Sequence, residues 1–113
     1  MNEDRDLQRI LTGLRAQYLA EAPGRIADLR AVLGRVRGGD GSALGELRLL
    51  LHRLAGSGGS YGLQAVTDTA RSAEHAVYEL MDRAAPVSDR DTERMSTLVD
   101  AVALAFREAG AAT

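Results

Sequence analysis

Apolar residues recur at spacings of three and four along most of the chain. In the first segment, about residues 4–21, Leu7, Leu11, Leu14 and Tyr18 follow one another at spacings of 4, 3 and 4. This spacing places side chains on one face of an α-helix. No comparable run alternates apolar and polar residues in the way that a half-buried strand does. The pattern therefore predicts an all-α protein.

Four further segments carry the same period, over residues 23–37, 42–60, 63–83 and 89–109. The breaks between them are short: GGDGS ends at Ser42, and AAPVSDRD contains Pro86, with Ser88 or Asp89 available to cap the last helix. Short connections between helices of this length imply antiparallel neighbours. We expect an antiparallel up-and-down four-helix bundle with an additional N-terminal helix packed on it, forming a single domain over residues 1–113.

Composition and charge exclude several classes of protein. The chain has no cysteine and no lysine, so disulfides, thiolate chemistry and lysine amine chemistry are excluded. A formal net charge of −2 gives no reason to expect nucleic acid as a partner. No apolar run approaches the roughly 18 residues of a membrane span, and the acidic start MNEDRD does not resemble a signal peptide. We therefore expect a cytoplasmic protein without a membrane partner.

The stretch LHRLAGSGGSYG, residues 51–62, combines a lone histidine with several glycines. On a helical wheel, the core-facing positions lie within about 60° of Leu51; they are Leu44, Leu47, Leu54 and Gly58. His52 lies about 100° from Leu51, at the boundary with solvent. The glycines on its own side of the helix are Gly45, Gly56 and Gly59.

Glycines inside a helix each cost roughly 0.5–1 kcal/mol relative to alanine, so their presence calls for a reason. One reading is a helix face kept free of side chains, where a partner can approach His52. The other is a frayed helix end or loop, with Gly62 as its C-cap. The residues alone leave both open.

Other chemistries fit this chain poorly. A Walker loop needs a lysine, and the glycines follow a helix where a dinucleotide fingerprint needs a strand. Gly56-Ser57-Gly58 lacks the spacing of a serine nucleophile elbow. The candidate metal ligands have no recognised ligand spacing; they are His52, His75, Glu74 and Glu79. We therefore expect neither a metal nor a cofactor bound by this chain.

His52, Leu54, Gly56 and Gly62 resemble the signature of histidine-containing phosphotransfer (HPt) domains, small helical modules of bacterial multistep phosphorelays. Downstream, Ala70 and Glu74 look like the following helix of that family. The resemblance covers essentially the whole chain in helix order and length.

The resemblance implies a phosphocarrier without turnover of its own. His52 would accept a phosphoryl group on Nε2 from an aspartate of a response-regulator receiver domain. It would then pass the group to an aspartate of another receiver domain. The receivers would bring Mg²⁺, and a hybrid histidine kinase is a further candidate partner. The residues expected at the docking face are Gly45, Ala55, Gly56 and Gly59. We expect a monomer; the alternative function is a non-phosphorylated helical adaptor that docks receivers or another helical partner.

The chain departs from the family at one position. HPt domains commonly have a lysine three residues after the histidine, and this chain has Ala55 there. By geometry Arg48, one turn before His52, is the best substitute for stabilising the phosphoryl group, and Arg53 is a weaker candidate. No carboxylate that could orient the imidazole is evident from the sequence.

Overall fold

The computed structural model describes residues 2–83 and 85–112, which form five α-helices without a β-strand. The helices are α1 (Asn2–Ala20), α2 (Ala22–Arg37), α3 (Ala43–Ser60), α4 (Gln64–Asp82) and α5 (Asp89–Ala111). The predicted boundaries agree with these to within two residues. Residues 1, 84 and 113 of the predicted domain lie outside the described residues.

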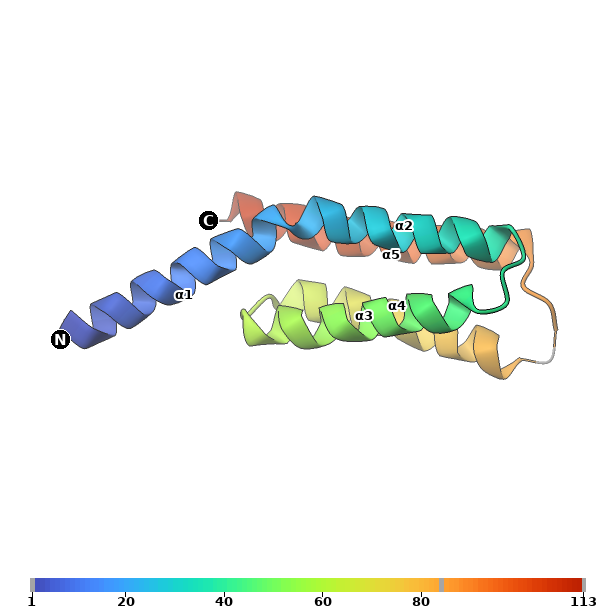
Figure 1. Ribbon diagram of the computed structural model, residues 1–113, viewed down its shortest axis with the longest axis horizontal. Coiled ribbons are helices and arrows are strands. Elements are labelled where there is room, and N and C mark those ends of the chain that lie inside the picture. Colours follow the sequence, from blue (N-terminus) through green and yellow to red (C-terminus); the bar gives the residue numbers. More distant parts are fainter. Residues whose placement is uncertain (1, 84, 113) are drawn as a thin grey trace.

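Helices α2 to α5 form an antiparallel four-helix bundle, which confirms the predicted fold class (Figure 1). One layer consists of α2 and α5, and the other of α3 and α4; contacts between α2 and α3 and between α4 and α5 join the layers. The largest fully buried side chains come from all four helices; they are Leu29, Leu47, Leu51, Val66, Val77, Met95, Val99 and Val102. This core fixes which side of α3 faces solvent.

The glycine-rich stretch is helical up to Ser60, and the helix then ends in a Schellman motif. Gly62 adopts a φ of 71°, and its N–H donates to the Gly59 carbonyl at 3.1 Å. The Leu63 N–H donates to the Gly58 carbonyl at 2.8 Å. The role of Gly62 at the helix end is thus confirmed, while Gly56, Gly58 and Gly59 belong to the helix itself.

Gly58 lets α3 and α4 approach closely. A Cβ at this position would lie 3.0 Å from Val66 Cγ1 and 3.0 Å from Thr67 Oγ1, which is tighter than ordinary packing. A Cβ at Gly45 or Gly56 would meet nothing within 4 Å. The predicted division between a core-facing glycine and outward-facing glycines is therefore confirmed.

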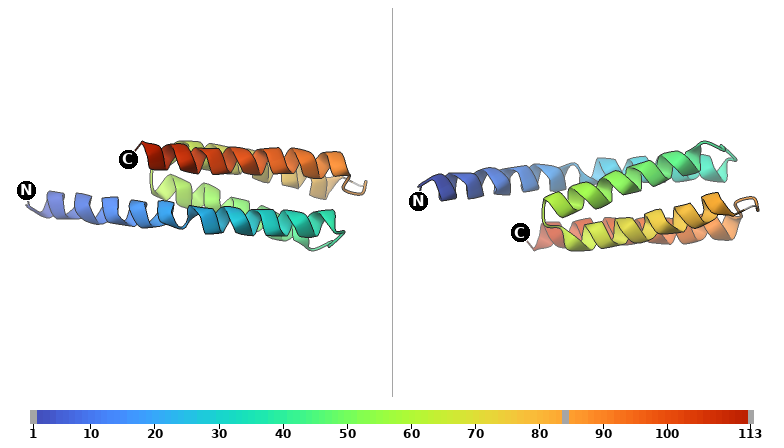
Figure 2. Two further views of the ribbon diagram at one scale, coloured as in Figure 1. Left: turned by 90° about the horizontal axis from the view of Figure 1, so that it is seen from above. Right: turned by 90° about the horizontal axis from the view of Figure 1, so that it is seen from below.

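The prediction that the N-terminal helix packs on the bundle is wrong for most of its length. Only the end of α1 is anchored: Tyr18 is 4% exposed, its ring stacks on Tyr61 at 4.6 Å, and its hydroxyl lies 2.6 Å from Ser57 Oγ. The rest of α1 runs beyond the end of the bundle (Figure 2). Periodicity predicted the apolar face of α1, but α3 ends at Ser60 and offers that face nothing further to cover it.

Candidate functional site

His52 stands on the solvent side of α3, with 65% of its side chain exposed. Its neighbours Leu51 and Leu54 are buried in the core, at 0% and 4% exposure, and hold this part of the helix in place. The imidazole is therefore presented to solvent from a rigid element. This is the placement that the helical wheel predicts.

A buried carboxylate orients the imidazole. Glu74 Oε2, on α4, lies 3.0 Å from His52 Nδ1, and the Glu74 side chain is only 11% exposed. An ionised carboxylate can only accept hydrogen bonds, and a contact with one requires the proton of a neutral imidazole to lie on Nδ1. The Nε2 lone pair of the neutral ring is then left free on the solvent side.

The sequence-based view that His52 has no carboxylate to orient it is wrong. Glu74 lies 22 residues away on the neighbouring helix, so no spacing within α3 could show the contact. A signal did exist: Glu74 follows Ala70 by four residues and precedes Val77 by three, which places a charge on the core-facing side of α4. Such a buried charge needs a partner.

Arg48 reaches the same carboxylate oxygen. Its Nη1 lies 3.5 Å from Glu74 Oε2 and donates to the Tyr78 hydroxyl at 3.1 Å, with the guanidinium carbon 5.3 Å from the centre of the Tyr78 ring. Arg48 is thus held beside His52 through Glu74. Arg53 is exposed on a different side of α3 and is not part of this cluster.

The residues expected to form the docking face divide into two groups. Gly56 is exposed and Gly45 is half-buried, and a Cβ at either would meet nothing within 4 Å. Gly59 is exposed although a Cβ there would touch Thr67 Oγ1 at 3.5 Å. The prediction that Ala55 belongs to the docking face is wrong, because Ala55 is only 5% exposed and its carbonyl accepts a hydrogen bond from Thr67. The wheel places Ala55 about 40° from Leu51, within the core-facing range, and α4 covers it.

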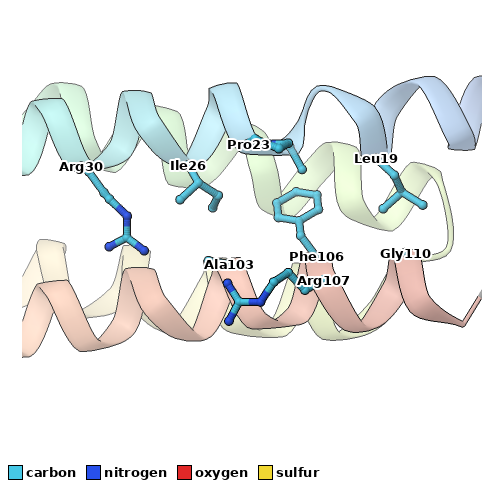
Figure 3. A pocket seen from close by; sticks show the side chains of 9 residues that line it. Leu19, Pro23, Ile26, Arg30, Ala103, Phe106, Arg107 and Gly110 are labelled. Atoms are coloured by element: carbon cyan, nitrogen blue, oxygen red, sulfur yellow. The ribbon is translucent and has the colours of Figure 1, made fainter.

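Other candidate features lie away from His52. His75 is on the exposed side of α4, 3.3 Å from Glu79, and the described residues contain no group of three or more potential metal ligands. A hollow of about 460 Å³ lies between α2 and α5, in the layer opposite α3 and α4 (Figure 3). Arg30 at this hollow is paired with Asp100 at 2.8 Å. Neither feature contributes to the surroundings of the imidazole.

The Hpt domain family model matches residues 13–105, which is most of the chain. This chain belongs to the Hpt domain family. The matched residues include all of α3 and α4, and with them His52, Glu74 and Arg48. No curated protein and no solved structure matches the chain.

Membership in the Hpt family gives the chain a phosphotransfer role in phosphorelays, as a phosphocarrier. The resemblance read from His52, Gly56 and Gly62 is thereby confirmed at the level of the family. None of the described helices of this Hpt domain is long and apolar enough to cross a membrane.

Proposed function

We propose that this Hpt domain accepts a phosphoryl group from a receiver aspartate on Nε2 of His52 and passes it to another receiver aspartate. The observation that carries the proposal is the contact between His52 Nδ1 and the buried Glu74 carboxylate. This contact would orient the ring and favour the tautomer with its proton on Nδ1, while 65% of the side chain stays exposed. An oriented nucleophile is the main requirement of phosphoryl transfer, because the reaction depends mostly on positioning and charge neutralisation.

In the forward step the Nε2 lone pair attacks the phosphorus of the aspartyl phosphate. The N–P bond forms as the P–O bond to the aspartate breaks, and the aspartate leaves as a carboxylate. The Nδ1 proton stays on the ring, so the ring gains a positive charge. Glu74 lies 3.0 Å from Nδ1 and stabilises that charge. The reverse of this step delivers the phosphoryl group to the next receiver.

Arg48 is the cation best placed to help hold the phosphoryl oxygens. It lies one turn before His52 on α3 and is kept near the ring by Glu74 and by Tyr78. A guanidinium binds phosphate oxygens through several N–H donors, which suits it to replace an ammonium at this position. The receiver would supply Mg²⁺ and its own acidic residues.

The surface around His52 supports docking of a receiver. Gly56 follows His52 by one turn and has no side chain, and Gly45 lies two turns before it with the same property. A partner backbone can therefore approach the imidazole closely from this side. Glycine at these open positions is not required by the packing of the bundle.

The test is phosphotransfer from a receiver domain that carries radiolabelled phosphate. Label should move to the wild-type protein, resist alkali and be lost in acid, as expected of a phosphoramidate. His52→Gln should abolish labelling, and His75→Gln is the matched control because His75 is an exposed histidine on the neighbouring helix. Labelling that persists in His52→Gln would overturn the proposal. Receiver binding without any transfer would instead indicate a non-phosphorylated adaptor.

A further inference from the structure

A hollow of about 460 Å³ lies where the last turn of α1 and the start of α2 face the end of α5 (Figure 3). Its walls are mainly apolar and include Leu19, Pro23, Ile26 and Phe106. Small residues of α5 leave this space, since Ala103 has only a methyl group and a Cβ added at Gly110 would meet nothing within 4 Å. The volume is within the range of about 300–1,000 Å³ that is typical of sites for small ligands.

The shape of the hollow admits a narrow occupant. Ala22, Ile26 and Phe106 line it and are nonetheless buried, so its floor is reached through a narrow opening between the packed helices α2 and α5. An α-helix of a partner protein is about 10 Å across with its side chains, which is too wide for such an opening. The hollow extends from Ala103 to Gly110, or about 10 Å along the axis of α5 at 1.5 Å per residue. An extended chain advances about 1.2 Å per bond, so about eight carbons span this length.

Two guanidinium groups line the same hollow. Arg30 comes from α2 and Arg107 from α5, and Figure 3 shows both guanidinium groups toward the end opposite to Leu19. Arg30 is already paired with Asp100, whose carboxylate lies 2.8 Å from its Nη1. The side chain of Arg107 has no ion pair or hydrogen bond among the residues that the structure describes. Arg107 is therefore available to an anion.

We propose that this hollow binds a small amphipathic carboxylate, with the carboxylate on Arg107 and an unbranched apolar tail of about eight carbons against Ile26 and Phe106. A guanidinium binds a carboxylate through parallel N–H donors, and such charge-assisted hydrogen bonds are stronger than neutral ones. The apolar walls favour the tail, because each methylene removed from water adds to the affinity. Asp100 already neutralises Arg30, so the site favours one negative charge over two.

The site is separate from the phosphoacceptor. It lies between α2 and α5, whereas His52 projects from α3 in the other layer of the bundle. A bound tail would contact the ends of α1 and α5 together with the first turns of α2. Because only the folded protein has the hollow, the bound carboxylate would also raise the melting temperature.

Titration of the ¹⁵N-labelled full chain with octanoate, followed through amide chemical shifts, tests the site. The shifts should saturate and should be largest around Ile26, Ala103 and Phe106. The affinity should rise about twofold to fourfold for each methylene added between butanoate and octanoate. Shifts that do not saturate, or that saturate only on the exposed apolar face of α1, would overturn the proposal.

Arg107→Ala tests the charge. The dissociation constant for octanoate should rise about tenfold, because a charged hydrogen-bond partner is lost. The dissociation constant for 1-octanol, which has the same tail without the charge, should change little. Arg90→Ala is the matched control, since Arg90 is an exposed arginine at the opposite end of α5. Equal losses for octanoate and 1-octanol, or an equal loss in Arg90→Ala, would reject the role given to Arg107.

Ala103→Leu tests the space. The added side chain should fill part of the hollow and weaken the binding of octanoate and of 1-octanol alike. Gly110→Leu does the same from the other end, at a position where a Cβ meets nothing within 4 Å, so the test survives if one variant fails to fold. Unchanged binding in a folded variant would count against the site. None of these measurements involves phosphoryl transfer, so their failure is distinguishable from failure of the phosphocarrier proposal.

Discussion

Arg48 and His52 stand one turn apart on α3 and reach the same oxygen atom of α4. Their nitrogens lie 3.5 Å and 3.0 Å from Glu74 Oε2. A single buried carboxylate thus positions both the proposed nucleophile and the proposed phosphate-binding cation.

Replacing Glu74 should slow transfer without removing the acceptor. In Glu74→Ala the imidazole loses its partner and can rotate, so the rate of phosphotransfer should fall about tenfold to a hundredfold. Glu74→Gln retains an acceptor oxygen and should lose less. Imidazole ¹⁵N chemical shifts provide a readout that a purely structural role would not move: the Nδ1–H tautomer should dominate in the wild-type protein but not in Glu74→Ala. An unchanged tautomer would contradict the role given to Glu74.

Arg48→Ala should reduce the rate of transfer roughly tenfold, because one donor to the phosphoryl oxygens is lost. Arg53→Ala is the matched control: it removes an arginine next to His52 in sequence but outside the Glu74 cluster, and the rate should change little. The measurement is single-turnover transfer from a phosphorylated receiver. If Arg53→Ala were the slower variant, the assignment of the cation would be wrong.

Substitutions at two glycines of α3 should affect docking and folding separately. The side chain added in Gly56→Leu would point into open space, so the protein should remain folded while this side chain blocks the approach of a receiver and hence transfer. Gly58→Leu would force atoms against Val66 and Thr67 and should destabilise the fold by about 3 kcal/mol, as overpacked cores do. Urea unfolding and transfer assays on both variants test the contrast. Equal losses of stability in the two variants would contradict it.

Gly62→Ala should destabilise the protein by roughly 1–2 kcal/mol, because its φ of 71° is unfavourable for a residue with a Cβ. Space is not the cause, since a Cβ there would meet nothing within 4 Å. The measurement is the free energy of unfolding in urea. Gly56→Ala, within the helix, is the opposite case and should stabilise by about 0.5–1 kcal/mol.

Stability should fall in acid partly through the loop before α3. Hydrogen bonds from Ser42 and from Arg35 lower the pKa of Asp40 from 3.8 to about 2. A lowered pKa in the folded state stabilises the fold above the ordinary value, and this contribution is lost as the pH falls from about 4 to 2. Melting temperatures of the wild-type protein and of Asp40→Asn measured across this interval should converge at low pH. A constant difference between them would contradict the prediction.

The sequence by itself determined the helices, their order and the outward position of His52. These properties follow from local periodicity and from the breaks at Gly38–Ser42 and Pro86, which need no knowledge of neighbouring elements. The sequence also predicted that Gly58 faces the core and Gly56 faces solvent, since the angle of each residue on the helical wheel is enough to decide this. Even the family could be recognised from the residues around His52.

The tertiary structure decided which residues from different helices meet. It placed Glu74 against His52, buried Ala55 beside Thr67, and left most of the apolar face of α1 without a cover. Periodicity gives the direction of a side chain around its own helix, but not the register or the length of the helix opposite. Those are set by the packing of α3 against α4, where the absence of a side chain at Gly58 lets the two helices come close.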